Sequence, residues 1–288
     1  MQQHSDQFPI DKMAKEFKVS RSGYYKFVNK KASATTKENL ELIKEISLIH
    51  KKSNYVYGSP RVHAVLKKKG KKCSRKRVAK LMRQNGIKAK TIKKWKATTN
   101  GSKDMSKIAP NVLDQNFTVT LANKVWVQDI TYIPTNEGWL YLSAVLDLYS
   151  RKIVGLSMGS RIDTNLVTKS LYQALTHRKP GPGLILHSDR GVQYTSSEYK
   201  KIANDNQLLI SMSAKGNCYD NAVMESFFHT LKTEHVFFCD YKTRNEAMVS
   251  IFEYIEIFYN RQRIHSTINF MSPDEYENIK STKLDESR

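Results

Sequence analysis

A carboxylate stands in the middle of an apolar, β-branched run, and this feature restricts the fold more than any other. Asp129 lies between Val125 and Ile133, and the alternation within this run predicts a buried strand. An ionised carboxylate is costly to bury unless it is paired or bound to a cation. A fold built on this strand must therefore supply Asp129 with a partner.

Two more acidic residues stand at comparable places. Asp189 follows the apolar run Leu184–Leu186, with Gly191 suited to a turn at the strand end, and Glu225 lies in a helical segment. Each acid alone could be an ordinary cap or surface charge. Together, oxygen ligands on a strand, a strand end and a helix can hold two divalent cations about 4 Å apart for phosphodiester chemistry.

The segment around Glu225 carries further candidates. Glu225, His229 and Lys232 share one helical face at offsets of four and seven residues. Lys232 is therefore predicted to contact DNA rather than to be only a solvated lysine. Asp147, at a strand end, is interpreted as structural or supporting, and Asp220 as the cap of this helix.

The charge of the chain is unevenly distributed. Residues 1–110 hold 29 Lys and Arg against 7 Asp and Glu, and residues 111–288 hold 19 against 20, within a net charge of +21. A basic half of this kind indicates a polyanionic partner, most often nucleic acid. Apolar runs are too short for a membrane span and Met1–Ile10 lacks a secretory core, so we expect a cytoplasmic, nucleoid-associated protein.

Cysteine usage agrees with this location. The three cysteines are odd in number and fit no zinc-binding spacing, so they are predicted to be free thiols in a reducing compartment: Cys73, Cys218 and Cys239.

Two short helices in the basic half form a helix-turn-helix pattern. Ser59 and Pro60 begin the first, Ser74 caps the second, and Gly70 and Gly86 end them. The second helix places apolar residues on one side and basic residues on the rest. The predicted DNA contacts, with a solvated charged face as the alternative, are Arg75, Lys76, Arg77, Lys80 and Arg83.

The pattern predicts five regions. Residues 1–54 form an N-terminal helical segment, whose first part is either the end of a helix-turn-helix or a plain helical hairpin. Its last helix carries Leu40, Ile43, Ile46 and Ile49 on one side. Residues 55–97 form the basic helix-turn-helix domain, 98–120 a linker, 121–236 the catalytic core and 237–288 a C-terminal helical extension.

The order of elements in the core predicts an α/β fold. Strands over 125–133, 139–148 and 152–158 follow one another closely, as in an antiparallel meander. A helix capped by Asp163 or Thr164, a strand over 184–187, a helix near 197–204 and a strand over 208–212 follow. Strands first, then alternating helices and strands, indicate a mixed sheet covered by helices.

Four stretches of the chain carry a resemblance to a known family. They are Trp126–Tyr132, His187–Ser196, Lys215–Glu234 and Tyr259–Tyr276. Between about residues 57 and 276, the chain resembles the second-frame (OrfB) transposases of insertion sequences in the family named after insertion sequence three. Its most specific marks are the spacing from Asp189 to Glu225 and the position of Lys232, seven residues beyond Glu225.

The resemblance implies a DDE transposase with a ribonuclease-H-like core similar to retroviral integrase. It implies that Asp129, Asp189 and Glu225 are the catalytic metal ligands, with Mg²⁺, or Mn²⁺ in its place, as cofactor. The implied reaction cleaves the ends of the element and transfers a 3′-hydroxyl strand to another phosphodiester. Implied partners are double-stranded DNA of element ends and target, further copies of the chain on DNA, and the first-frame product.

Two other functions remain open from the sequence. A plain ribonuclease H or nuclease would share the acids but hardly needs the basic extension. A DNA-binding fragment that regulates transposition, inactive without the first-frame product, would share the basic half but does not need the three acids.

Overall fold

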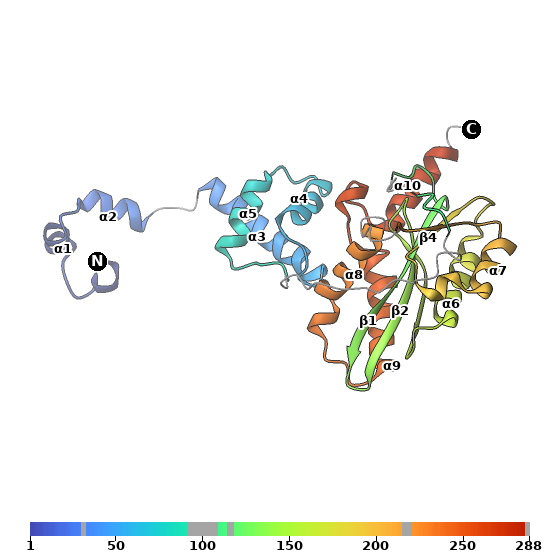
Figure 1. Ribbon diagram of the computed structural model, residues 1–288. Helices are drawn as coiled ribbons and strands as arrows, with labels where there is room; N and C mark the ends of the chain where they lie inside the picture. The colour runs from blue at the N-terminus through green and yellow to red at the C-terminus, as the bar shows by residue number, and fades with distance from the viewer. Residues whose placement is uncertain (30–32, 91–108, 114–117, 215–220, 286–288) are drawn as a thin grey trace.

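The computed structural model describes residues 1–29, 33–90, 109–113, 118–214 and 221–285. A helical hairpin at the N-terminus leads to a helical unit and then to a sheet covered by helices on both faces (Figure 1). The hairpin consists of α1 (Ile10–Glu16) and α2 (Arg21–Val28). The helical unit consists of α3 (Ala34–Lys52), α4 (Ser59–Lys68) and α5 (Arg75–Gln84).

The helical unit packs around a small apolar core. Ile46, Val62, Leu66 and Val78 are completely buried between α3, α4 and α5. Ser74 caps α5 as predicted, accepting a hydrogen bond from the N–H of Arg77 at 3.2 Å. Gly58, rather than Ser59, is the N-cap residue of α4.

One apolar position of α3 was predicted wrongly. Leu40 is 56% exposed, whereas Leu42 is buried beside Ile46 and Ile49. Leu40 lies about 240° around the helix from Ile46, because each residue advances the helix by roughly 100°. Leu42 and Ile46 are one turn apart and therefore share the inner face.

The sheet has five strands in the order β3-β2-β1-β4-β5. The first three form the predicted antiparallel meander, and β4 and β5 continue it in parallel with β1. This is the mixed sheet predicted from the order of elements. The strands are β1 (Val125–Thr135), β2 (Gly138–Asp147), β3 (Ile153–Gly159), β4 (Ile185–Ser188) and β5 (Leu209–Met212).

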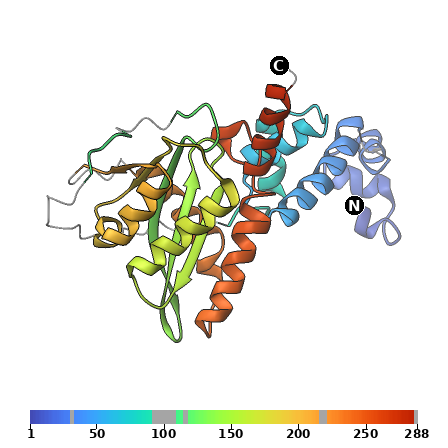
Figure 2. The ribbon, with the colours of Figure 1, turned by 90° about the vertical axis from the view of Figure 1, so that its right-hand side faces the viewer.

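Helices cover both faces of the sheet (Figures 1 and 2). On one face α6 (Thr164–Arg178) and α7 (Ser197–Asp205) pack over Trp126, Val145 and Leu186. On the other, the apolar core includes residues of α8 (Ala222–Glu234), α9 (Arg244–Glu253) and the π-helical segment Tyr254–Tyr259 that continues it. α10 (Pro273–Asp285) completes the C-terminal part.

Capping residues begin several of these helices where the sequence predicts. The carboxylate of Asp163 accepts a hydrogen bond from the N–H of Leu166 at 2.8 Å at the start of α6. Thr243 accepts one from Glu246 at 3.1 Å at the start of α9. Asp220, interpreted as a cap of α8, lies outside the described residues, and Asn221 is the N-cap residue without a side-chain bond.

Part of the predicted linker packs against the core. The N–H groups of Val112 and Leu113 donate to the hydroxyl of Ser211 in β5, at 2.9 and 3.2 Å. Leu113 is buried. In the part of the chain that the structure describes, no helix has the length and hydropathy to cross a bilayer.

An ion-pair network joins the helical unit to the covered sheet. Glu234, the last residue of α8, accepts two hydrogen bonds from Arg263 at 2.6 Å and one from Arg61 of α4 at 3.2 Å. The hydroxyl of Tyr254 donates a fourth bond at 3.1 Å. Beside them, the hydroxyl of Tyr57 accepts from the N–H of Ile264 at 2.8 Å.

Burial alone would raise the pKa of Glu234, but the hydrogen bonds and charge of Arg263, aided by Arg61, lower it overall. The folded state therefore favours the ionised carboxylate. This contribution to stability is present above the ordinary glutamate pKa and is lost as the pH falls through the lower folded value. Because Arg263 is almost completely buried, its guanidinium needs the carboxylate of Glu234 as a counter-charge.

We expect Glu234→Gln to lower the free energy of unfolding by about 3 kcal/mol at neutral pH, because the variant leaves the guanidinium of Arg263 buried without its counter-charge. Urea denaturation measures the loss, which should shrink as the pH is lowered. Glu45→Gln, which removes an exposed partner of Lys69, is the control and should cost far less. Equal stability of Glu234→Gln and the parent chain would contradict this account.

Candidate active site

The two aspartates lie at matching positions of neighbouring parallel strands. In the parallel pair of β1 and β4, Val125 lies opposite Ile185 and Val127 lies opposite His187. The same difference in residue number separates Asp129 from Asp189. Both acids therefore stand two residues beyond the last paired residues. Side chains alternate along a strand and neighbouring strands lie about 4.8 Å apart. The two carboxylates thus extend from the same end of the β1–β4 pair.

Each aspartate is fixed by one backbone hydrogen bond. The Oδ1 of Asp129 accepts from the N–H of Ile130 at 2.7 Å, and the Oδ1 of Asp189 accepts from the N–H of Gly191 at 2.8 Å. The second bond is the turn at the strand end that Gly191 predicts. Both side chains are only partly exposed.

The electrostatics of the pair are unfavourable. Burial raises the pKa of Asp129 well above its usual value, and the charges of Asp189 and Glu225 raise it further. Burial also raises the pKa of Asp189, against the hydrogen bond from Gly191. Like charges in a shielded position disfavour ionisation of both groups. A cation placed between them would remove this cost.

Glu225 approaches the pair from α8. Met224, Phe227, Phe228 and Leu231 bury one side of this helix, and Glu225 in its first turn stays exposed. Its charge acts on Asp129. Among the described residues, no three acidic, histidine or cysteine side chains stand close enough to hold a metal as a set. Glu225 is thus the outlying member, at the rim of the aspartate pair.

Lys232 also lies near the aspartates. Its ammonium stands 4.5 Å from the ring centroid of Tyr132 on β1. Burial lowers the pKa of Lys232, while the charge of Asp129 acts in the opposite direction. His229, predicted on the same face, is exposed. Lys215, which precedes this helix in sequence, lies outside the described residues.

Buried polar side chains next to the acids were not predicted from the sequence. Gln128, directly before Asp129, donates to the carbonyl of Val167 and the hydroxyl of Ser170, both at 2.9 Å. Its carbonyl accepts from the hydroxyl of Tyr199 at 2.6 Å. A glutamine inside an apolar run was the available signal. This network joins β1 to α6 and α7 and holds the strand that carries Asp129.

A second buried group supports Asp189. The ring of His187 bonds to the hydroxyls of Ser211 and Ser213, at 2.9 and 3.2 Å. The next residue after Asp189, Arg190, donates to the carbonyl of Ser213 at 2.6 Å. These contacts tie the end of β4 to β5.

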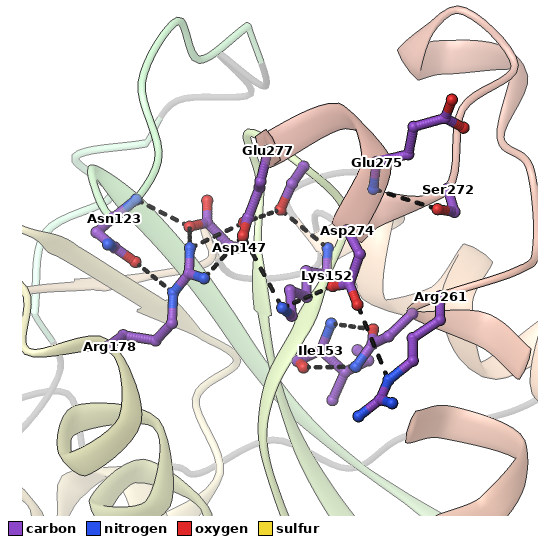
Figure 3. A network of polar contacts seen from close by, with 12 residues as sticks. Asn123, Asp147, Lys152, Ile153, Arg178, Arg261, Ser272, Asp274, Glu275 and Glu277 are labelled. Carbon is purple, nitrogen blue, oxygen red and sulfur yellow. Dashed lines mark hydrogen bonds and ion pairs between the residues drawn. The ribbon is translucent and has the colours of Figure 1, made fainter. Parts of the chain in front are cut away.

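Asp147 belongs to a structural network instead (Figure 3). Its buried carboxylate accepts from the N–H groups of Asn123 and Tyr149, at 2.8 and 3.0 Å, and from Arg178 at 3.4 Å. Arg178 also holds Glu277 of α10 with two bonds of 2.8 Å. The geometry agrees with the structural interpretation of Asp147.

The basic residues of α5 fall into two groups. Arg75, Lys76, Lys80 and Arg83 are exposed. The guanidinium of Arg77 is turned towards α3, where it donates to Asn39 at 2.9 Å and Glu38 at 3.0 Å.

Comparisons with known proteins agree with this geometry. An HTH-like domain family matches residues 37–95, and two integrase core domain families match residues 120–218 and 225–280. The transposase InsF of insertion sequence IS3A from Escherichia coli is 36% identical over 280 residues, covering 96% of this chain and 97% of the relative. This chain belongs to the IS3 family of transposases.

Other relatives extend the comparison. The insertion element IS600 31 kDa protein of Shigella sonnei is 44% identical and covers 91% of this IS3-family chain and 96% of the relative. The IS904 transposase of Lactococcus lactis is 46% identical over 78% of this chain and 88% of the relative. The integrase catalytic core of HTLV-2 aligns with 56% of this chain and 99% of its own at 13% identity and a TM-score of 0.45. The integrase-core matches together with the mixed sheet confirm the predicted ribonuclease-H-like α/β fold.

We expect Asp129→Asn to raise the free energy of unfolding in metal-free buffer near neutral pH by about 1 kcal/mol, the usual size of a single-residue effect, because the amide removes a charge that burial and Asp189 disfavour. The raised folded pKa means that the parent chain loses stability as the pH rises from the ordinary aspartate pKa through the folded value. Chemical denaturation across this pH range measures the effect.

Asp205→Asn, at an exposed position of α7, is the matched control and should change little. Added Mg²⁺ should raise the melting temperature of the parent chain more than that of Asp129→Asn. A less stable Asp129→Asn in metal-free buffer would contradict the repulsion between the carboxylates.

Proposed function

We propose that this IS3-family transposase cleaves the ends of an insertion sequence and joins the resulting 3′-hydroxyl strand to another phosphodiester through Asp129, Asp189 and Glu225. One observation carries the proposal: Asp129 and Asp189 each follow the last paired residue of two neighbouring parallel strands by two positions. Helix α8, which carries Glu225, belongs to the apolar core that includes Val125 and Val127 of β1. The charge of Glu225 acts on Asp129.

The donor set suits Mg²⁺, with Mn²⁺ as a substitute. Carboxylate oxygens are the hard ligands that these cations prefer, and the two aspartates repel each other without one. Bound in this place, two cations would stabilise the attacking and leaving oxygens of the displaced phosphodiester. One oxygen of each aspartate accepts a hydrogen bond from a backbone N–H, which orients the carboxylate so that the other oxygen can bind a cation.

Lys232 has a different role in this proposal. Its ammonium is placed on the Asp129 side of α8, seven residues beyond Glu225. A cation there attracts the phosphate backbone and holds a DNA strand beside the acids. Glu225 and Lys232 on one helix would thus act on the same strand.

The helical unit supplies DNA affinity. Exposed Arg75, Lys76, Lys80 and Arg83 form a basic surface on α5 that suits duplex DNA. Because Arg61 and Tyr57 anchor this unit to α8 and the C-terminal part, DNA held by α5 has a defined position relative to the acids. We further propose that the chain works as a homo-oligomer on paired ends and engages the first-frame product.

Strand transfer with a pre-cleaved end duplex carrying a free 3′-hydroxyl tests the catalytic assignment. We expect the parent chain to form joined product with Mg²⁺ or Mn²⁺, and Glu225→Gln to lose at least two orders of magnitude in rate, as expected when transition-state charge stabilisation is removed. Glu198→Gln changes a glutamate in the first turn of α7 and should join at the parental rate.

DNA binding must be measured on the same variants. Glu225→Gln should bind the end duplex normally, which separates chemistry from affinity. If the parent chain binds the duplex but never joins it, the chain is a regulatory DNA-binding fragment that depends on the first-frame product, and the proposal fails.

Salt-dependent binding tests the basic surface of α5. We expect Lys76→Ala, Lys80→Ala and Arg83→Ala each to weaken duplex binding and to reduce the slope of log K against log salt by about one. Fluorescence anisotropy over a salt series measures both values.

Arg77→Ala is the informative comparison. Because Arg77 is bonded to Glu38 and Asn39, we expect this variant to lose stability while the salt slope stays close to the parental one. Unchanged slopes for all of the exposed variants would exclude α5 as the DNA contact.

A further inference from the structure

An aromatic side chain is exposed near the hairpin that joins β1 to β2. Trp139, the second residue of β2, is 49% exposed. Its ring meets Tyr132 of β1 edge to face, with centroids 5.0 Å apart and an interplanar angle of 82°. Tyr132 in turn faces the ammonium of Lys232 at 4.5 Å. We call this row, Lys232, Tyr132 and Trp139, the aromatic ladder.

The ladder begins beside the acids and leads away from them. Tyr132 stands three residues beyond Asp129 on β1, about 10 Å along the strand at roughly 3.3 Å per residue, and its side chain therefore extends to the opposite face of the sheet. Lys232 is the member of the ladder that lies near the acids, because the charge of Asp129 acts on its ammonium. Tyr132 and Trp139 extend the ladder from Lys232 to the exposed hairpin.

The hairpin that presents Trp139 is held in place by α9 and the segment before it. The N–H of Arg244 donates to the carboxylate of Glu137 at 2.8 Å, and its guanidinium donates to the carbonyl of Trp139 at 3.0 Å. The N–H of Asn136 donates to the carbonyl of Tyr241 at 3.0 Å. The indole is therefore exposed on a fixed backbone, which reduces the entropy lost when a ligand stacks on it.

The composition of the ladder indicates which ligand it takes. An exposed indole can stack on a flat ring, and a neighbouring ammonium can pair with a phosphate. A paired base inside a duplex is stacked on both faces, and the terminal pair of a blunt end exposes one face but is held rigidly by its partner. An unpaired nucleotide can turn its base onto an indole while its phosphate contacts a neighbouring ammonium.

We propose that the aromatic ladder binds an unpaired nucleotide of the DNA strand next to the reacting phosphodiester, with its base on Trp139 and its phosphate at Lys232. This inference rests on the proposed function for the position of the reacting phosphodiester. The ladder holds the single-stranded segment that separates from the duplex at the cleavage point, with Lys232 as the contact nearest the acids.

The test uses a duplex of fixed sequence, either blunt or with a short single-stranded 3′ extension that contains 2-aminopurine. We expect Trp139→Ala to weaken binding of the extended duplex about tenfold, the order of one base-aromatic stack, and to leave the blunt duplex unaffected. Binding to the parent chain should quench the 2-aminopurine at one position, and Trp139→Ala should abolish this quenching.

Two control variants complete the test. Trp139→Phe keeps an aromatic face and should retain most of the affinity and quenching. Tyr172→Ala removes a comparably exposed aromatic side chain, 53% exposed on α6, and should behave as the parent chain. Circular dichroism melting checks that Trp139→Ala is folded, and a folded variant is expected because the bond from Arg244 is to the backbone of Trp139.

Three results would overturn the inference: equal binding of the extended duplex by Trp139→Ala and the parent chain, equal losses for extended and blunt duplexes, or a changed sedimentation coefficient of Trp139→Ala with unchanged DNA binding. The last would show a contact between copies. Glu225→Gln separates this inference from the proposed function, because that variant should still quench 2-aminopurine while joining no DNA. Quenching by a parent chain that never joins DNA would overturn the function and leave the nucleotide site standing.

Discussion

The parallel pairing of β1 with β4 is the contact on which the proposed active site depends. It brings Asp129 and Asp189 from distant parts of the sequence to matching positions at one end of two neighbouring strands. A shift of one residue would turn one carboxylate to the opposite face of the sheet, because side chains alternate along a strand. The register is maintained by the apolar layers on both faces and by the buried polar bonds of Gln128 and His187.

This placement is unfavourable for the folded chain alone. Burial and mutual repulsion raise the pKa of Asp129 and burial raises that of Asp189, so the site carries a cost that the rest of the fold must offset. Part of this cost is offset by the buried hydrogen bonds that Gln128, the residue before Asp129, makes with Tyr199 and Ser170. Such strain at a site is expected where function, rather than stability, selects the residues.

Helix α8 connects the candidate active site to the helical unit. Glu225 lies in its first turn and its charge acts on Asp129, Lys232 lies against Tyr132 of β1, and Glu234 at its end binds Arg263 and Arg61. A single rigid helix therefore relates the position of the helical DNA-binding unit to that of the acids. Asp147, which is completely buried, fastens β2 to α6 and α10 through Arg178 and Glu277.

The sequence by itself determined the secondary-structure elements and predicted the chemistry of the acids. Periodicity located all five strands within about two residues, and capping residues such as Ser74 and Asp163 began helices as predicted, because these signals are local. Leu40 was misjudged because an apolar residue near a helix start does not reveal which side will be covered. The partners of Arg77, Glu234 and Asp147, and the row from Lys232 to Trp139, were decided only by the tertiary structure. Those contacts join residues far apart in sequence, and no local pattern encodes which distant side chains the packing of helices on a sheet will bring together.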